Sequence, residues 1–101
     1  MILTATVLFV LAEILIGVVL IFLPWSRIKG WFTNHESVIN ADEENLRVTL
    51  HEKLGNGQHR VVYGIFNKST SQFVDGEVAV TEQIDDEIAA FHKNAPLVVY
   101  T

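Results

Sequence analysis

The sequence contains no cysteine, and this absence limits the chemistry available to the chain. Disulfide bonds, iron–sulfur clusters and thiolate zinc sites all need cysteine sulfur, so these features are excluded. Basic residues are also few, because the 101 residues carry seven Lys or Arg against twelve Asp or Glu, for a formal net charge of −5. Without a basic patch, we do not expect the chain to bind nucleic acid.

Motifs typical of enzymes are absent as well. The four histidines do not have the spacing of an HExxH metal face, no glycine-rich loop precedes a helix, and there is no nucleophile elbow. We therefore predict no catalytic residue, no cofactor, no metal site and no small-molecule substrate. His51 and His59 flank a predicted hairpin turn and can approach each other, but facing histidines on a hairpin are more often plain surface residues than ligands.

The most prominent feature that is present is an apolar run over residues 2–23, in which Glu13 is the single charged residue. As a helix, the run spans about 33 Å at about 1.5 Å per residue, which is enough to cross the hydrocarbon core of a bilayer. Its Leu, Ile, Val and Phe residues outweigh the insertion cost of one acid. The run therefore predicts a transmembrane helix over residues 1–24.

An acid inside this helix predicts a partner. A carboxylate facing lipid is costly, so we expect Glu13 to be protonated, turned toward another polypeptide, or both. Helical spacing places Thr6, Glu13 and Gly17 on one stripe of small and polar residues, which predicts the interface with a partner helix. We interpret Glu13 as a packing residue, with assembly control and proton or ion handling as the alternatives.

The residues after the run indicate its orientation. No Lys or Arg precedes the run, whereas Arg27 and Lys29 follow it closely, so the amino terminus is predicted outside and the carboxyl-terminal part in the cytoplasm or its organellar equivalent. Trp25 and Trp31 alternate with the two cations. Together the four residues predict an interfacial collar on the lipid bilayer, within a collar and acidic linker over residues 25–45. The alternative is that one tryptophan packs on a partner subunit.

The remaining residues, 46–101, predict a small cytoplasmic α+β domain. Strands are expected at residues 46–51 and 60–66, joined by a turn at residues 55–57, and at residues 73–80 and 97–100. A helix is expected at residues 82–93, with Thr81 as its N-cap. This β-β-β-α-β order predicts a mixed sheet of about four strands with one covering helix and with the last strand parallel to the first.

The predicted fold class is thus a single transmembrane α-helix plus a small α+β domain, and it suggests a non-catalytic single-pass membrane protein. The favoured function is a small accessory or assembly subunit of a larger membrane complex, with integral membrane proteins as partners. One alternative is a membrane-anchored adaptor or regulator that recruits a cytoplasmic partner, for example by strand addition at an open sheet edge. Another is a homo-oligomeric proton or ion conductor that uses a ring of Glu13 side chains.

Overall fold

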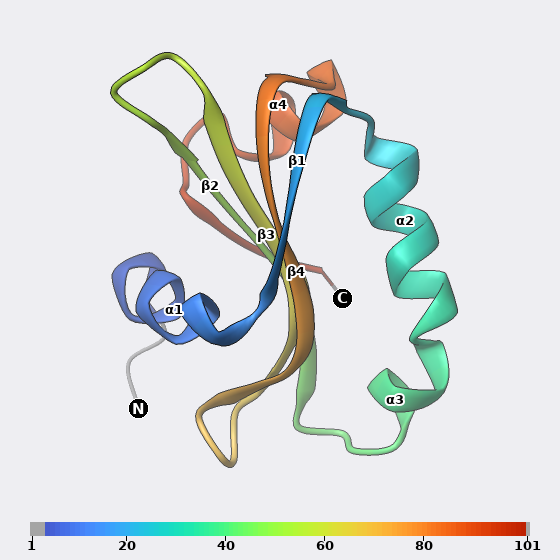
Figure 1. The fold of residues 1–101 in the computed structure, drawn as a ribbon. Coiled ribbons are helices and arrows are strands. Elements are labelled where there is room, and N and C mark those ends of the chain that lie inside the picture. Colours follow the sequence, from blue (N-terminus) through green and yellow to red (C-terminus); the bar gives the residue numbers. More distant parts are fainter. Residues whose placement is uncertain (1–3, 101) are drawn as a thin grey trace.

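A five-stranded mixed sheet forms the centre of the structure, and helices cover both of its faces (Figure 1). This computed structural model describes residues 4–100, so residues 1–3 of the predicted transmembrane segment and residue 101 of the predicted domain lie outside the described residues. The strand order is β1-β4-β3-β2-β5. The strands β1 and β4 run parallel, and the other three neighbouring pairs are antiparallel.

The amino-terminal apolar run does not form one helix. It forms α1 (Ala5–Leu11), a 3₁₀ turn η1 (Ala12–Ile14) and the strand β1 (Ile16–Leu23). In the part of the chain that the structure describes, no helix is both long enough and apolar enough to cross a membrane. The predicted transmembrane helix is therefore wrong, and the single-pass localisation that was derived from it is not supported.

Residue type explains why the second half of the run is extended. β1 has the sequence IGVVLIFL, in which four of eight residues are β-branched. Such side chains lose rotamer freedom in a helix and pack well on a pleated sheet. An apolar run of this length also fits a strand whose two faces both carry apolar side chains. Hydropathy alone does not separate these two structures.

The predicted hairpin and third strand are confirmed. β2 (Asn45–Lys53) pairs antiparallel with β3 (His59–Asn67), and β3 pairs antiparallel with β4 (Gln72–Ile84). β4 has 13 residues and continues well past the predicted end at residue 80. The extension matters because it lies beside β1, with Leu20 opposite Thr81 and Leu23 opposite Ile84.

The carboxyl-terminal elements are placed differently from the prediction. α4 (Asp86–Phe91) is shorter than the predicted helix, because the preceding residues belong to β4. Its N-cap is Asp85, whose carboxylate accepts the Glu87 backbone N–H, and not Thr81. β5 (Leu97–Tyr100) lies where a strand was expected but runs antiparallel to β2. Within residues 4–100 the fold thus has five strands and four α-helices, in place of the predicted four strands and one covering helix.

The predicted acidic linker contains two helices, α2 (Trp25–Asn34) and α3 (Glu36–Asn40), which lie across one face of the sheet (Figure 1). They pack with α4 over one apolar layer of the core, and α1 packs over the other. The central strand β3 supplies both layers, since Val61 and Tyr63 belong to the first and Val62 to the second.

Candidate functional site

β1 lies at an edge of the sheet that residues 4–100 form, and it pairs with β4. Its eight residues include no charged side chain. Natural edge strands usually carry charges, proline or a bulge that prevents another strand from pairing with them. Among the described residues no strand pairs with the outer side of β1, so alternate backbone N–H and C=O groups there are available to another polypeptide.

The side chains of β1 are also exposed. On the face that α1 partly covers, Val19 is 81% exposed and Ile21 is 75% exposed. The register assigns them to this face, because Gly17 is opposite Val78, a residue of the α1 layer, and side chains alternate along a strand. Ile16, on the other face, is 77% exposed. Exposed apolar patches of this kind typically mark interfaces with other molecules.

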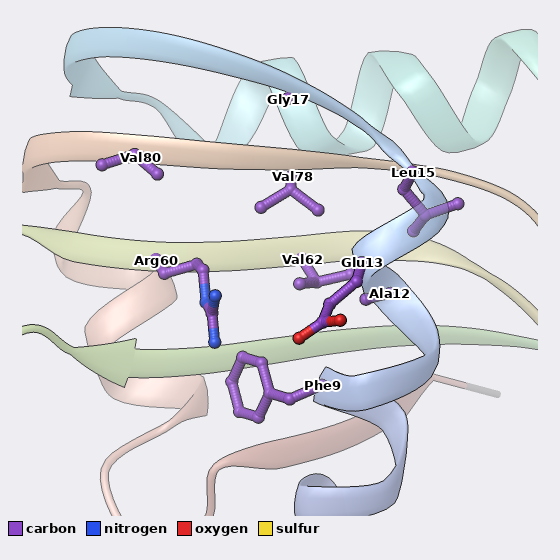
Figure 2. Close-up of a pocket in the computed structure, with 9 residues that line it drawn as sticks. All are labelled: Phe9, Ala12, Glu13, Leu15, Gly17, Arg60, Val62, Val78 and Val80. Atoms are coloured by element: carbon purple, nitrogen blue, oxygen red, sulfur yellow. The ribbon is translucent and has the colours of Figure 1, made fainter.

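A recess of about 280 Å³ lies where α1 and η1 meet this exposed part of the sheet (Figure 2). Its floor comes from β3 and β4, one wall comes from α1 and η1, and Gly17 contributes the part that belongs to β1. A Cβ atom added at Gly17 would have one neighbour, the Val78 carbonyl oxygen at 3.8 Å. No side chain therefore separates the recess from the edge of the sheet at this position. The lining residues are Phe9, Ala12, Glu13, Leu15, Gly17, Arg60, Val62, Val78 and Val80.

Two charged side chains of opposite sign border the recess, and they differ in their contacts. Arg60 forms an ion pair with Glu52, and its guanidinium lies over the Phe9 ring, 5.1 Å from the ring centroid. The Glu13 carboxylate extends from η1 toward the space beside Phe9 (Figure 2), and within residues 4–100 it has no hydrogen bond or ion pair. Glu13, Glu52 and Arg60 together carry a formal charge of −1 at this place.

The other end of β1 is acidic too. A second recess, of about 460 Å³, lies between the ends of β1, β3 and β4 and the start of α4. Phe22 of β1 and His59 of β3 line it together with three carboxylates, Glu82, Asp85 and Asp86. β1 is therefore an uncharged strand with acidic residues near both of its ends.

The predicted helix interface is brought together only in part. Glu13 and Gly17 both line the first recess, whereas Thr6 is exposed on α1 and does not line it. Glu13 belongs to η1 and Gly17 to β1, so the turn between these elements brings them together and not a shared helical stripe. The sequence thus selected two residues of the recess because of their polarity and small size.

The predicted collar residues lie on α2, where both indoles are half-buried and pack against the core. The Trp25 ring centroid is 4.9 Å from that of Phe91 and 5.7 Å from that of Tyr100. Trp31 stacks on His35, with 3.9 Å between ring centroids. These contacts join α2 to α4, to β5 and to its own C-cap residue. A membrane-surface role for the two indoles stays an untested prediction.

Of the two cations in the predicted collar, Lys29 is exposed and Arg27 joins a hydrogen-bonded group. The Arg27 Nε donates to the Tyr63 hydroxyl at 3.1 Å, and its Nη2 donates to Glu77 Oε1 at 3.0 Å. The Tyr63 hydroxyl in turn donates to the same Glu77 oxygen. Burial of the ring raises the pKa of Tyr63 above its usual value. The group links α2 to β3 and β4.

Three histidines cluster on the sheet face below α4. His51 Nε2 and His59 Nδ1 are 2.9 Å apart, so their expected approach is confirmed. His92 hydrogen-bonds the Thr49 hydroxyl at 2.7 Å and the Ala95 carbonyl at 2.9 Å. Burial lowers the pKa of each ring, and for His51 it does so to about 4, with help from the other two histidines. Within the described chain, no three His, Cys, Asp or Glu side chains are arranged to hold a metal ion.

The β1 edge is the feature that was not predicted from the sequence. The β-branched content of residues 16–21 favours a strand there, but it does not indicate that this strand lies at the edge of the sheet. No protein-family model, no curated protein and no solved structure matches this chain.

Proposed function

We propose that this chain is a non-catalytic protein-binding subunit, and that it pairs with an extended segment of another protein along the outer edge of β1. The observation that carries the proposal is that the eight-residue edge strand β1 has no charged residue and, among residues 4–100, has no strand paired with its outer side. Strand addition at such an edge gains main-chain hydrogen bonds, and the flanking side chains provide specificity. This is the adaptor function that the sequence offered as an alternative, and it does not depend on the transmembrane helix that was predicted with it.

Charge favours a partner of a particular chemistry. The middle of β1 is apolar, whereas Glu13 lies near one end and Glu82 and Asp86 lie near the other. A complementary segment is therefore apolar in its middle and basic at its ends. A second copy of this chain fits less well, because antiparallel self-pairing places Glu13 of one copy beside the acidic end of the other.

The polar clusters elsewhere support a binding role. The Arg27, Tyr63 and Glu77 side chains bond one another, and His92 is held by Thr49 and Ala95. The polar side chains of these two clusters are hydrogen-bonded within each cluster and stabilise the fold. The exposed apolar side chains of β1 are not packed in the core, so they are available to bind another molecule.

The test uses a synthetic peptide with alternating valine and threonine in its centre and lysine at both ends. We expect this peptide to bind, and a peptide with glutamate at both ends to bind much more weakly. N-methylation at alternate peptide residues should abolish binding in one register and leave it intact in the other, because only alternate N–H groups of an added strand face β1. Equal effects of both N-methylated sets would overturn strand addition.

A pair of protein variants locates the binding edge. Val19→Lys adds charge to an exposed position of β1, and Val74→Lys makes the same change at an exposed position of β4 outside this edge. We expect Val19→Lys to weaken peptide binding about tenfold, which corresponds to about 1.4 kcal/mol, and Val74→Lys to leave it unchanged. Equal binding by both variants, or a dimer of the wild-type chain that Val19→Lys dissociates, would contradict the proposed partner.

A further inference from the structure

We infer that the segment bound at β1 carries a lysine or arginine whose side chain crosses Gly17, fills the first recess and ends beside Glu13. This inference rests on the proposed function and names the residue that the β1 edge selects. Gly17 and Glu13 are then specificity-determining residues, one providing space and the other providing charge.

Gly17 provides the space because it interrupts the row of side chains along β1. Its neighbours on the same face of the strand are the exposed Val19 and, across the sheet, Val78. In an added strand, the side chain of the residue opposite Gly17 would point to that same face of the sheet. Its Cβ atom would lie about 5 Å from the position that a Cβ atom on Gly17 would take. With no side chain at Gly17, a long side chain at that position can lie across the glycine and enter the recess (Figure 2).

The recess suits the stem of a basic side chain. Its floor is apolar, formed by Val62, Val78 and Val80, and methylene groups of lysine and arginine pack well on such surfaces. Its volume of about 280 Å³ is just below the roughly 300–1,000 Å³ of ligand pockets, so it accommodates one long side chain better than a drug-sized molecule.

Glu13 provides the charge. Arg60 is already engaged by Glu52 and by the Phe9 ring, and within residues 4–100 the Glu13 carboxylate has no cationic partner. A partner glutamate would be repelled by it, and a purely apolar side chain would desolvate it without compensation. A lysine or arginine satisfies both the apolar floor and the acid at the rim.

The experiment replaces each central residue of the lysine-ended peptide in turn by lysine, norleucine or glutamate and measures affinity by fluorescence polarisation. Norleucine keeps the unbranched apolar stem and removes the charge. At one position we expect lysine to bind about two- to fivefold more tightly than norleucine, the range for an exposed ion pair. Added salt should reduce this preference.

Variants then assign the preference to this recess. Glu13→Gln should abolish the preference for lysine and leave binding of the norleucine peptide intact. Glu36→Gln is the control and should preserve the preference for lysine, because Glu36 is an exposed acid on α3, which covers the sheet face opposite to the recess. Gly17→Val should weaken binding of the lysine peptide and of the norleucine peptide to the level of a peptide that has alanine at the same position. Thermal melting of each variant confirms that the fold is retained.

The outcomes separate the two proposals. If the N-methylation and Val19→Lys effects hold but no position prefers lysine, or if Glu13→Gln keeps that preference, the selection of a basic residue is wrong and strand addition stands. If none of the peptides binds, the proposed function fails and this inference fails with it.

Discussion

The imidazoles of His51 and His59 are joined by a hydrogen bond of 2.9 Å between Nε2 of His51 and Nδ1 of His59. His51 comes from β2 and His59 from β3, so the bond crosses the hairpin. The ring centroids of His92 and His51 are 5.7 Å apart. The positive charge of Lys53 helps burial to lower the pKa of His59. Three neighbouring imidazoles and a cation disfavour protonation, in addition to the effect of burial.

This cluster predicts that the protein loses stability as the solution is acidified. The pKa of His51 is lowered from 6.5 to about 4, so between these pH values the unfolded chain binds more protons than the folded chain. The contribution of the neutral His51 ring to the free energy of unfolding is complete above pH 6.5, and it is lost as the pH falls toward 4. We expect a loss of about 1–2 kcal/mol, less than the full shift implies because the ring is partly solvated.

Urea unfolding at about pH 7.5 and at about pH 5 measures this loss. His51→Gln should flatten the dependence, since the variant has no imidazole to protonate at the centre of the cluster. His35→Gln is the matched control, because His35 pairs with Asp75 outside the cluster. An unchanged pH dependence in His51→Gln would show that other groups cause it.

Tyr63 and Glu77 should contribute to stability as a coupled pair. Tyr63→Phe removes the hydroxyl that donates to Glu77 and accepts from Arg27, and we expect it to cost about 1–2 kcal/mol. Glu77→Gln should cost a similar amount. In a double-mutant cycle, measured by urea unfolding, the double variant should cost at least about 0.5 kcal/mol less than the sum of the single variants. Simple additivity would contradict the coupling.

Gly64 should tolerate no larger residue. A Cβ atom there would lie 2.7 Å from the Asp75 carbonyl oxygen and 3.0 Å from the Gly76 Cα, and both of these are backbone atoms of the paired strand. We expect Gly64→Ala to cost about 2–3 kcal/mol, because the strands must separate to accept the methyl group.

Gly30→Ala is the control for this prediction. Gly30 is exposed on α2, and an added Cβ would have no atom within 4 Å. Alanine is favoured over glycine within a helix, so this variant should be more stable by about 0.5–1 kcal/mol. Thermal melting distinguishes the two, since the melting temperature should fall for Gly64→Ala and rise for Gly30→Ala. A fall in both variants would contradict the steric explanation.

The sequence allowed the β2–β3 hairpin to be predicted because its signals are local. Polar and apolar residues alternate in β2, and the turn contains Gly55 and Gly57, of which Gly57 has a φ of 88°. β1 lacks a comparable signal, since Val18 on its core-facing side and Val19 on its exposed side are both apolar. The alternation of buried and exposed positions therefore does not appear as an alternation of apolar and polar residues. The high hydropathy of the whole run instead favoured a transmembrane helix.

One further error follows from the same strand. Residues 82–84 extend β4, where β1 lies beside them, whereas the sequence predicted a helix over residues 82–93 with Thr81 as its N-cap. The exposed edge depends on sheet order, which no local pattern encodes. Glu13 and Gly17 were predicted as part of an interface with a partner helix. Both line the first recess, and their contact with a partner stays a prediction.

Neighbouring substitutions in β1 test this strand directly. Val18 packs against the layer under α2, and Val19 is 81% exposed on the opposite face. Val18→Asp places an unpaired charge in the core and should cost about 2–4 kcal/mol, whereas Val19→Asp should change the free energy of unfolding by less than about 1 kcal/mol. Urea unfolding of the two variants measures the contrast. Leu20→Asp and Ile21→Asp should repeat it, since a strand alternates its faces at every residue. Equal costs at adjacent positions would show that residues 16–23 do not form the strand, and the edge-binding proposal would then lose its basis.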